Sequence, residues 1–179
     1  SQLVESECSF ASVYSCMAGI QAMRTDFDGA LENIKIAYKL SQSESNSSFR
    51  LVVILVYTLV LYGRGDSNGV KELLNEADGI VKSNVISPGA LAIYVAMKGT
   101  NLIEGNEIER AKEFFREYGV EAGKKISFVE DRGYFPYTIL LLLQSRFSEA
   151  ELVLNQLHTM AEAANRIETL IDVKILYAI

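Results

Sequence analysis

The feature that most constrains the fold of this chain is an internal period of about forty residues. A small side chain follows a turn and begins a helical pattern four times, at Ala30, Val70, Ala111 and Ala150. These four anchors are 40, 41 and 39 residues apart. Apolar residues recur four and seven positions after the anchors, and such positions share one face of a helix. We therefore expect stacked copies of one small helical unit.

Each copy of the repeat reads as two helices joined by a short turn. An apolar stretch precedes each turn, at residues 14–23, 51–62, 90–102 and 134–143. The second helix of each copy is expected to begin three residues before its anchor, at Phe27, Ser67, Ile108 and Phe147. No alternating pattern of β-branched residues indicates a strand.

A pair of helices of this size cannot bury its apolar face alone, so neighbouring pairs must stack and share a core. The sequence therefore predicts an all-α fold. We expect one domain over residues 1–179, a right-handed α-α superhelix of tetratricopeptide-like helix pairs. The superhelix would hold four pairs and a final truncated helix. The apolar pattern at the C-terminal end suggests that this sequence is a fragment of a longer protein.

Charge and hydropathy limit the partners. The chain carries 17 basic and 23 acidic residues, a net charge of -6 that disfavours direct contact with nucleic acid. Its most apolar run, Leu51 to Tyr62, is twelve residues long, whereas a membrane-spanning helix needs about 20. The N-terminus lacks a secretory pattern. We expect a cytoplasmic protein that does not contact a membrane.

The two cysteines, Cys8 and Cys16, fall on one expected helix, where their backbones would lie about 12 Å apart. A disulfide cannot span that distance, so we interpret both as small buried apolar side chains. His158 is the single histidine and has no partner at a metal-ligand spacing. The glycine-rich segment 63–69 lacks the lysine of a phosphate-binding loop and is interpreted as a turn. We expect this segment to have no enzymatic activity and to bind neither a metal nor a cofactor.

A more specific pattern occupies the C-terminal part of the chain. Residues 134–150 read YFPYTILLLLQSRFSEA, and residues 161–166 read AEAANR. They resemble Y-L-T-L-A-R-V-L-x-A-Q-G-R-x-x-E-A and A-E-A-A-G-R, signatures of the sensor region in MalT-type, LuxR-family transcription activators. Ser145 and Asn165 replace turn glycines of that family, and Ile139 replaces an arginine. The resemblance covers residues 108–179 well and residues 1–107 only at the level of the repeat.

The resemblance implies a sensor module between a nucleotide-binding domain and a DNA-binding helix-turn-helix. Neither the phosphate-binding loop nor the DNA-reading domain lies in these residues. The implied partners are a small-molecule inducer or a regulatory protein, together with the flanking domains of the parent chain. The alternative is a free-standing tetratricopeptide-like scaffold for protein interaction, with a homodimer among its forms.

Two surfaces are candidates for binding. The first helices of such repeats line the concave face, and tyrosines on them offer contact area and a hydroxyl. The candidate groove residues are Tyr62, Tyr94, Asn101, Glu104, Arg132, Tyr134 and Tyr137. Packing of these tyrosines in the core is the other interpretation. Val52, Leu55 and Leu59 share a helix face that would suit protein contact if it were open. The charged runs 107–113 and 121–125 are interpreted as solvated helix surface.

Overall fold

The computed structural model describes residues 2–178, with side chains for residues 10–178. In this part of the chain the regular structure consists of nine helices and no strand, so the prediction of an all-α fold is confirmed. The helices are α1 (Gln2–Met23), α2 (Phe27–Ser41), α3 (Ser47–Gly63), α4 (Ser67–Ser83), α5 (Pro88–Glu104), α6 (Ile108–Glu117), α7 (Asp131–Leu143), α8 (Phe147–Ala163) and α9 (Ile167–Tyr177).

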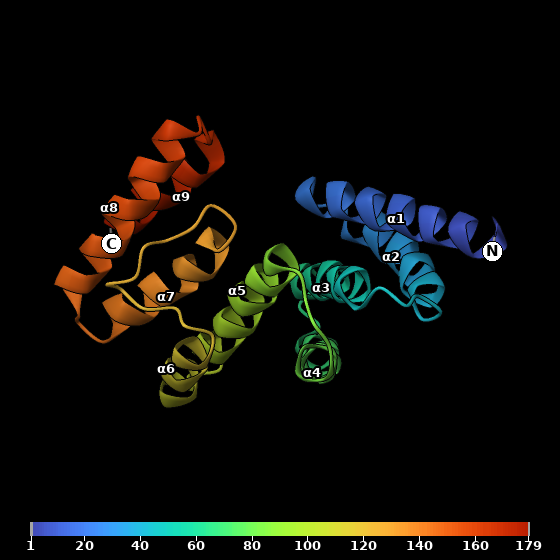
Figure 1. The fold of residues 1–179 in the computed structure, drawn as a ribbon, viewed down its shortest axis with the longest axis horizontal. Coiled ribbons are helices and arrows are strands. Elements are labelled where there is room, and N and C mark those ends of the chain that lie inside the picture. Colours follow the sequence, from blue (N-terminus) through green and yellow to red (C-terminus); the bar gives the residue numbers. More distant parts are fainter. Residues whose placement is uncertain (1, 179) are drawn as a thin grey trace. The chain divides into compact units, whose positions relative to one another are not determined.

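The chain divides into two compact units, Ser1–Leu91 and Ala92–Ile179. Unit 1 holds α1 to α4, and unit 2 holds most of α5 together with α6 to α9 (Figure 1). The arrangement of all the pairs in one superhelical domain stays a prediction.

The four anchors lie in the interior. Helices α2, α4, α6 and α8 each begin three residues before an anchor, as the sequence pattern predicts. Ala30, Val70, Ala111 and Ala150 are all at most 3% exposed. Small side chains at these positions let neighbouring helices approach closely, because little volume separates their backbones.

The same backbone turn joins five pairs of successive helices. Its middle residue has a left-handed φ of 53° to 75°, and the residue after it donates its N–H to the carbonyl five positions back. This is the Schellman arrangement that ends many helices. The middle residues are Thr25, Gly65, Asn106, Ser145 and Asn165. Only one of the five is glycine, although glycine adopts this conformation at the lowest cost.

In unit 1, α1 packs closely against α2, and α3 packs on both (Figure 1). Among the described side chains of α1, the buried ones are all small, namely Ala11, Ser15, Ala18 and Ala22, and Tyr14 packs partly buried against the same core. The opposite face of α1 is also apolar but exposed, with Phe10, Val13, Met17 and Ile20. Over residues 10–23, the outer face of α1 is therefore apolar, unlike the polar outer face of an ordinary surface helix.

In unit 2, residues 118–130 connect α6 to α7 without a helix. The connection is anchored by its buried apolar side chains, Val120, Ala122 and Ile126. Gln156 on α8 accepts a hydrogen bond from the Ile126 N–H at 3.2 Å and donates one to the Lys124 carbonyl at 3.3 Å. These contacts hold the connection against α8.

A second anchor of this connection is an arginine. The guanidinium of Arg166, in the turn between α8 and α9, forms an ion pair with the buried carboxylate of Asp131. It also lies over the Phe128 ring, 4.7 Å from the centroid. The charge on Asp131 is therefore compensated, as a buried carboxylate requires.

Some sequence-based expectations are wrong. Cys16 is exposed rather than buried, and Cys8 lies outside the residues whose side chains are described. The charged run 121–125 belongs to the connection between α6 and α7, not to a helix surface. Helix α7 begins at Asp131, three residues before the apolar stretch expected at 134–143. Pro136 therefore lies beyond the first turn of α7, where it cannot donate a backbone hydrogen bond.

The apolar face on α3 that would suit protein contact if it were open is mostly closed. Leu55 is 1% exposed, and Val52 is half-buried. Leu59 is the one exposed member of that set. The run from Leu51 to Tyr62 lies within α3 and packs mainly into the core, as expected of a buried helix.

Candidate functional site

Three of the tyrosines proposed for a groove are buried in unit 2. Tyr94, Tyr134 and Tyr137 are 2%, 1% and 7% exposed. They belong to one chain of edge-to-face ring contacts, which runs from Tyr94 through Phe114 and Phe115 to Tyr137 and Tyr134. The structure therefore brings these tyrosines together as core residues, and they offer almost no surface to a partner.

Burial raises the pKa of Tyr134 and Tyr137 above their ordinary value. Hydrogen bonds from the backbone at Glu121 and Ala122 act in the opposite direction. The two hydroxyls thus meet the connection between α6 and α7, which explains how polar tips are accommodated in an apolar interior.

The other predicted groove residues lie nearer the surface. Tyr62 on α3 is 48% exposed and belongs to unit 1. Asn101 is half-buried on α5, Glu104 is exposed at its end, and Arg132 is exposed on α7.

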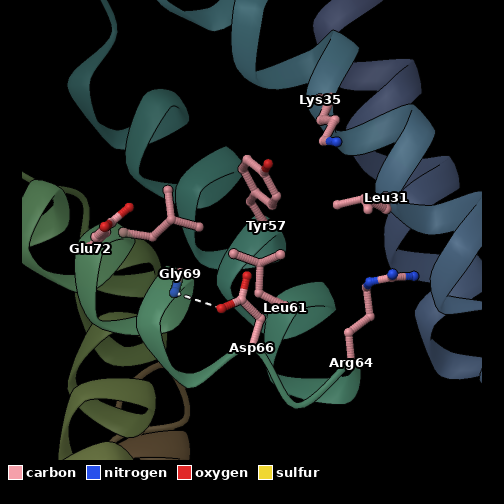
Figure 2. Close-up of a pocket in the computed structure, with 9 residues that line it drawn as sticks. Leu31, Lys35, Tyr57, Leu61, Arg64, Asp66, Gly69 and Glu72 are labelled. Carbon is pink, nitrogen blue, oxygen red and sulfur yellow. Dashed lines mark hydrogen bonds between the residues drawn. The ribbon is translucent and has the colours of Figure 1, made fainter.

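A hollow that no sequence motif indicates lies in unit 1. It has a volume of about 350 Å³ and is bordered by α2, α3, the turn between α3 and α4, and α4 (Figure 2). Its lining residues are Leu31, Lys35, Tyr57, Leu61, Arg64, Asp66, Gly69, Glu72 and Leu73. We call it the Tyr57 hollow, because that ring stands between Lys35 on one side and Glu72 on the other.

Two of the charges at the hollow already have partners within the protein. Asp66 is the N-cap of α4, and its carboxylate accepts a hydrogen bond from the Gly69 N–H at 2.9 Å. Arg64 reaches toward α2 and forms an ion pair with Asp28. The N-terminus of α4 needs the cap that Asp66 provides, since the first N–H groups of a helix have no partner within the helix.

Three polar groups at the hollow are not engaged in this way. Lys35 and Glu72 have neither an ion pair nor a hydrogen bond with any residue whose side chain is described. The Tyr57 hydroxyl likewise has no hydrogen-bond partner within that part of the protein. The hollow therefore combines an ammonium, a hydroxyl and a carboxylate that remain available to a ligand.

The tyrosines beside the hollow are electrostatically coupled to acidic residues. Burial, and then the negative charge of Asp66, raise the pKa of Tyr57. The Tyr57 ring meets the Tyr38 ring edge to face, with centroids 5.6 Å apart. Tyr38 donates its hydroxyl hydrogen to Glu76 Oε2 at 2.7 Å, and burial together with Glu76 raises its pKa to about 12. Both phenols are therefore neutral hydrogen-bonding groups near neutral pH.

This arrangement suits binding by hydrogen bonds, charge and apolar contact. Over the residues with described side chains, no cluster of His, Cys, Asp and Glu is arranged to hold a metal ion. No helix in the described part is long and apolar enough to cross a bilayer. His158 lies on α8, half-buried, with its Nδ1 3.5 Å from Oε2 of Glu162.

The signal for this hollow in the sequence is weak. Glycines indicate the turn at residues 63–66, which borders the hollow. Lys35 and Glu72 are single charges on amphipathic helices, a pattern that every surface helix shows. Their convergence depends on how α2 and α4 pack around α3, which spacing along one helix does not encode.

Comparisons with protein-family models, with curated proteins and with solved structures found no match to this chain.

Proposed function

We propose that this chain is a non-catalytic sensor module of a LuxR-family, MalT-like transcriptional regulator in the cytoplasm, and that the Tyr57 hollow is where its effector binds. The observation that carries the binding role is the set of unengaged groups on Lys35, Tyr57 and Glu72 around an apolar floor. The C-terminal sequence resemblance supports the regulatory role. The effector would be a small-molecule inducer or a regulatory protein.

The mechanism is a shift between two arrangements of the parent protein. An effector changes regulation only by the difference in its affinity for the resting and active arrangements. The hollow is bordered by three successive helices, so an occupant would restrict how α2 sits against the α3–α4 hairpin. That restriction can be passed to the flanking domains of the parent chain.

Binding can be tested with the isotope-labelled chain and backbone-amide NMR. The probes are a neutral trisaccharide, ATP and a tripeptide of glutamate, leucine and lysine, acetylated and amidated at its ends. We expect at least one probe to shift the amides of Tyr57, Leu61 and Glu72 while the Val153 amide of unit 2 stays unchanged. Shifts confined to unit 2, or none with any probe, would contradict the binding role.

The regulatory role has a separate test, the gene sequence on both sides of these residues. A nucleotide-binding domain upstream and a helix-turn-helix downstream are expected. Unrelated domains on both sides would contradict the assignment to a LuxR-family regulator and would leave the hollow as a binding site of another kind of protein.

A second candidate function is an interaction scaffold, and the outer face of α1 favours it. Phe10, Val13, Met17 and Ile20 form an apolar stripe whose members are 45% to 58% exposed. Exposed patches of this kind mark interaction surfaces. The molar mass from light scattering distinguishes the candidate functions. If the chain is a scaffold, we expect a stable dimer that the double substitution Val13→Ser and Met17→Ser dissociates. Val85→Ser, at an isolated exposed residue, is the matched control.

A further inference from the structure

The charges around the Tyr57 hollow have opposite signs on opposite walls. Lys35 projects from α2, and Glu72 projects from α4 (Figure 2). The two side chains do not form an ion pair with each other, although both line the same hollow. An occupant with one negative and one positive group can therefore satisfy both walls at once.

The remaining charges do not compete for this role. The Asp66 carboxylate is held by the Gly69 N–H, and Arg64 is paired with Asp28. Lys35 and Glu72 are thus the charged groups through which the hollow can discriminate between ligands.

The floor of the hollow is apolar and fixed. Leu61 and Leu73 are each 8% exposed, so their positions are determined by the core of unit 1. Leu31 on α2 completes the apolar lining. An apolar side chain placed here would be removed from water. Burial of apolar surface is the main favourable contribution to the free energy of such binding. The Tyr57 hydroxyl beside it can both donate to and accept from a peptide main chain.

We infer that the Tyr57 hollow recognises a peptide segment in which an apolar side chain stands between an acidic and a basic side chain. The inference rests on the proposed binding function of this hollow and names its ligand class. A neutral sugar would leave both charges unused, and a nucleotide would bring only negative charge toward Glu72. A volume of about 350 Å³ is at the small end for ligand sites and suits one side chain with its flanking groups.

The test uses the labelled chain and three tripeptides, each acetylated and amidated with leucine in the centre. One carries glutamate and lysine, one carries two glutamates, and one carries two lysines. We expect the mixed tripeptide to shift the amides of Tyr57, Leu61 and Glu72. It should bind roughly two- to fivefold more tightly than either of the others, the effect of one solvent-exposed ion pair.

Charge reversal at the walls gives the sharper result. Lys35→Glu should make the tripeptide with two lysines the best ligand, and Glu72→Lys should make the tripeptide with two glutamates the best. Lys82→Glu and Glu113→Lys change the net charge equally at exposed positions that do not line the hollow, so they should keep the preference for the mixed tripeptide.

The outcomes separate this inference from the proposed function. Equal binding of all three tripeptides at the hollow would overturn the charge recognition while leaving the binding role in place. The same conclusion follows if the two wall variants keep the wild-type preference. If neither the tripeptides nor the trisaccharide and ATP shift the amides of the hollow, the binding role itself is wrong.

Discussion

Tyrosine residues have different environments in the two units. In unit 2, Tyr94, Tyr134 and Tyr137 are buried in one aromatic cluster. In unit 1, Tyr57 is half-buried at the edge of a hollow, and Tyr62 is 48% exposed. Tyrosine on α5 and α7 therefore serves packing in unit 2, whereas Tyr57 on α3 lines a candidate binding site in unit 1.

The side chains near the anchors account for part of the difference. Four positions after its first anchor, unit 2 has Phe115, whereas unit 1 has the smaller Ile34 and Leu74 and the second anchor of unit 2 is followed by Leu154. The Phe115 ring fills the space above Gly99, where an added Cβ would lie only 2.3 Å from the ring. Phe115 also contacts Tyr137 edge to face, so it joins the aromatic cluster in the core of unit 2. The environment of a tyrosine here therefore depends on which side chains surround it in the folded unit.

The largest expected effect comes from removing one ring in each unit. Tyr134→Ala should destabilise the chain by about 3–5 kcal/mol, as for other large aromatic side chains in a core. Tyr57→Ala should lower the free energy of unfolding by only about 1 kcal/mol, mainly through its ring contact with Tyr38. Urea unfolding followed by circular dichroism measures both losses.

Tyr134→Phe is the matched control, because it keeps the ring and removes only the hydroxyl. It should retain most of the stability that Tyr134→Ala loses. Equal losses for Tyr57→Ala and Tyr134→Ala would show that the two tyrosines are equally part of a core, and the distinction between the units would be wrong.

The start of α2, α4, α6 and α8 could be predicted from the sequence because it depends on local features. The anchors and the residues four positions later are buried, since a helix with a 3.6-residue repeat must direct that face inward. Polar turn residues indicated where each second helix begins. Ala150, for example, is 1% exposed on α8, as the pattern predicts.

The environments of individual side chains could not be predicted in this way. Burial of Tyr94 depends on Phe114 and Tyr118, which contact it from another helix and its end. The approach of Lys35 and Glu72 to one hollow depends on tertiary packing of α2, α3 and α4. Neither relation leaves a regular spacing in the sequence, which is why the predicted groove and the observed hollow involve different residues.

The turns provide a second and smaller test in both units. Thr25 in unit 1 and Ser145 in unit 2 occupy the left-handed position, with φ of 62° and 57°. This backbone conformation costs a residue with a Cβ about 1–2 kcal/mol of free energy, and the cost is largest for a β-branched residue. Thr25→Gly should therefore raise the free energy of unfolding by about 1 kcal/mol, after allowance for the greater freedom of glycine in the unfolded chain.

Ser145→Gly should stabilise unit 2 by a somewhat smaller amount, because serine is not β-branched. The reverse change in the equivalent turn, Gly65→Thr, should destabilise unit 1 by a similar magnitude. Thermal unfolding of the three variants checks these signs. A loss of stability in Thr25→Gly would mean that the hydrogen bond from its hydroxyl to the Arg24 carbonyl outweighs the backbone cost.

The smallest expected effect concerns pH and distinguishes the hydroxyls of the two units. The pKa of Tyr38 is raised from 10.0 to about 12 by burial and then by Glu76. The folded chain therefore keeps this proton at pH values where the unfolded chain has released it. The stabilising contribution is complete below pH 10 and is lost as the pH rises through 12.

Tyr38→Phe removes this contribution, so its unfolding free energy should fall less steeply than that of the wild type between pH 10 and pH 12. Glu76→Gln should give an intermediate slope, because it removes the negative charge and leaves the burial, which is the larger cause. Tyr134 and Tyr137 contribute the same pH dependence of stability in all three proteins, since burial raises their pKa independently of Glu76. If the unfolding free energy of Glu76→Gln falls with pH as steeply as that of the wild type, the Glu76 carboxylate has no influence on the pKa of Tyr38. The tyrosines of unit 1 would then differ from those of unit 2 in exposure alone.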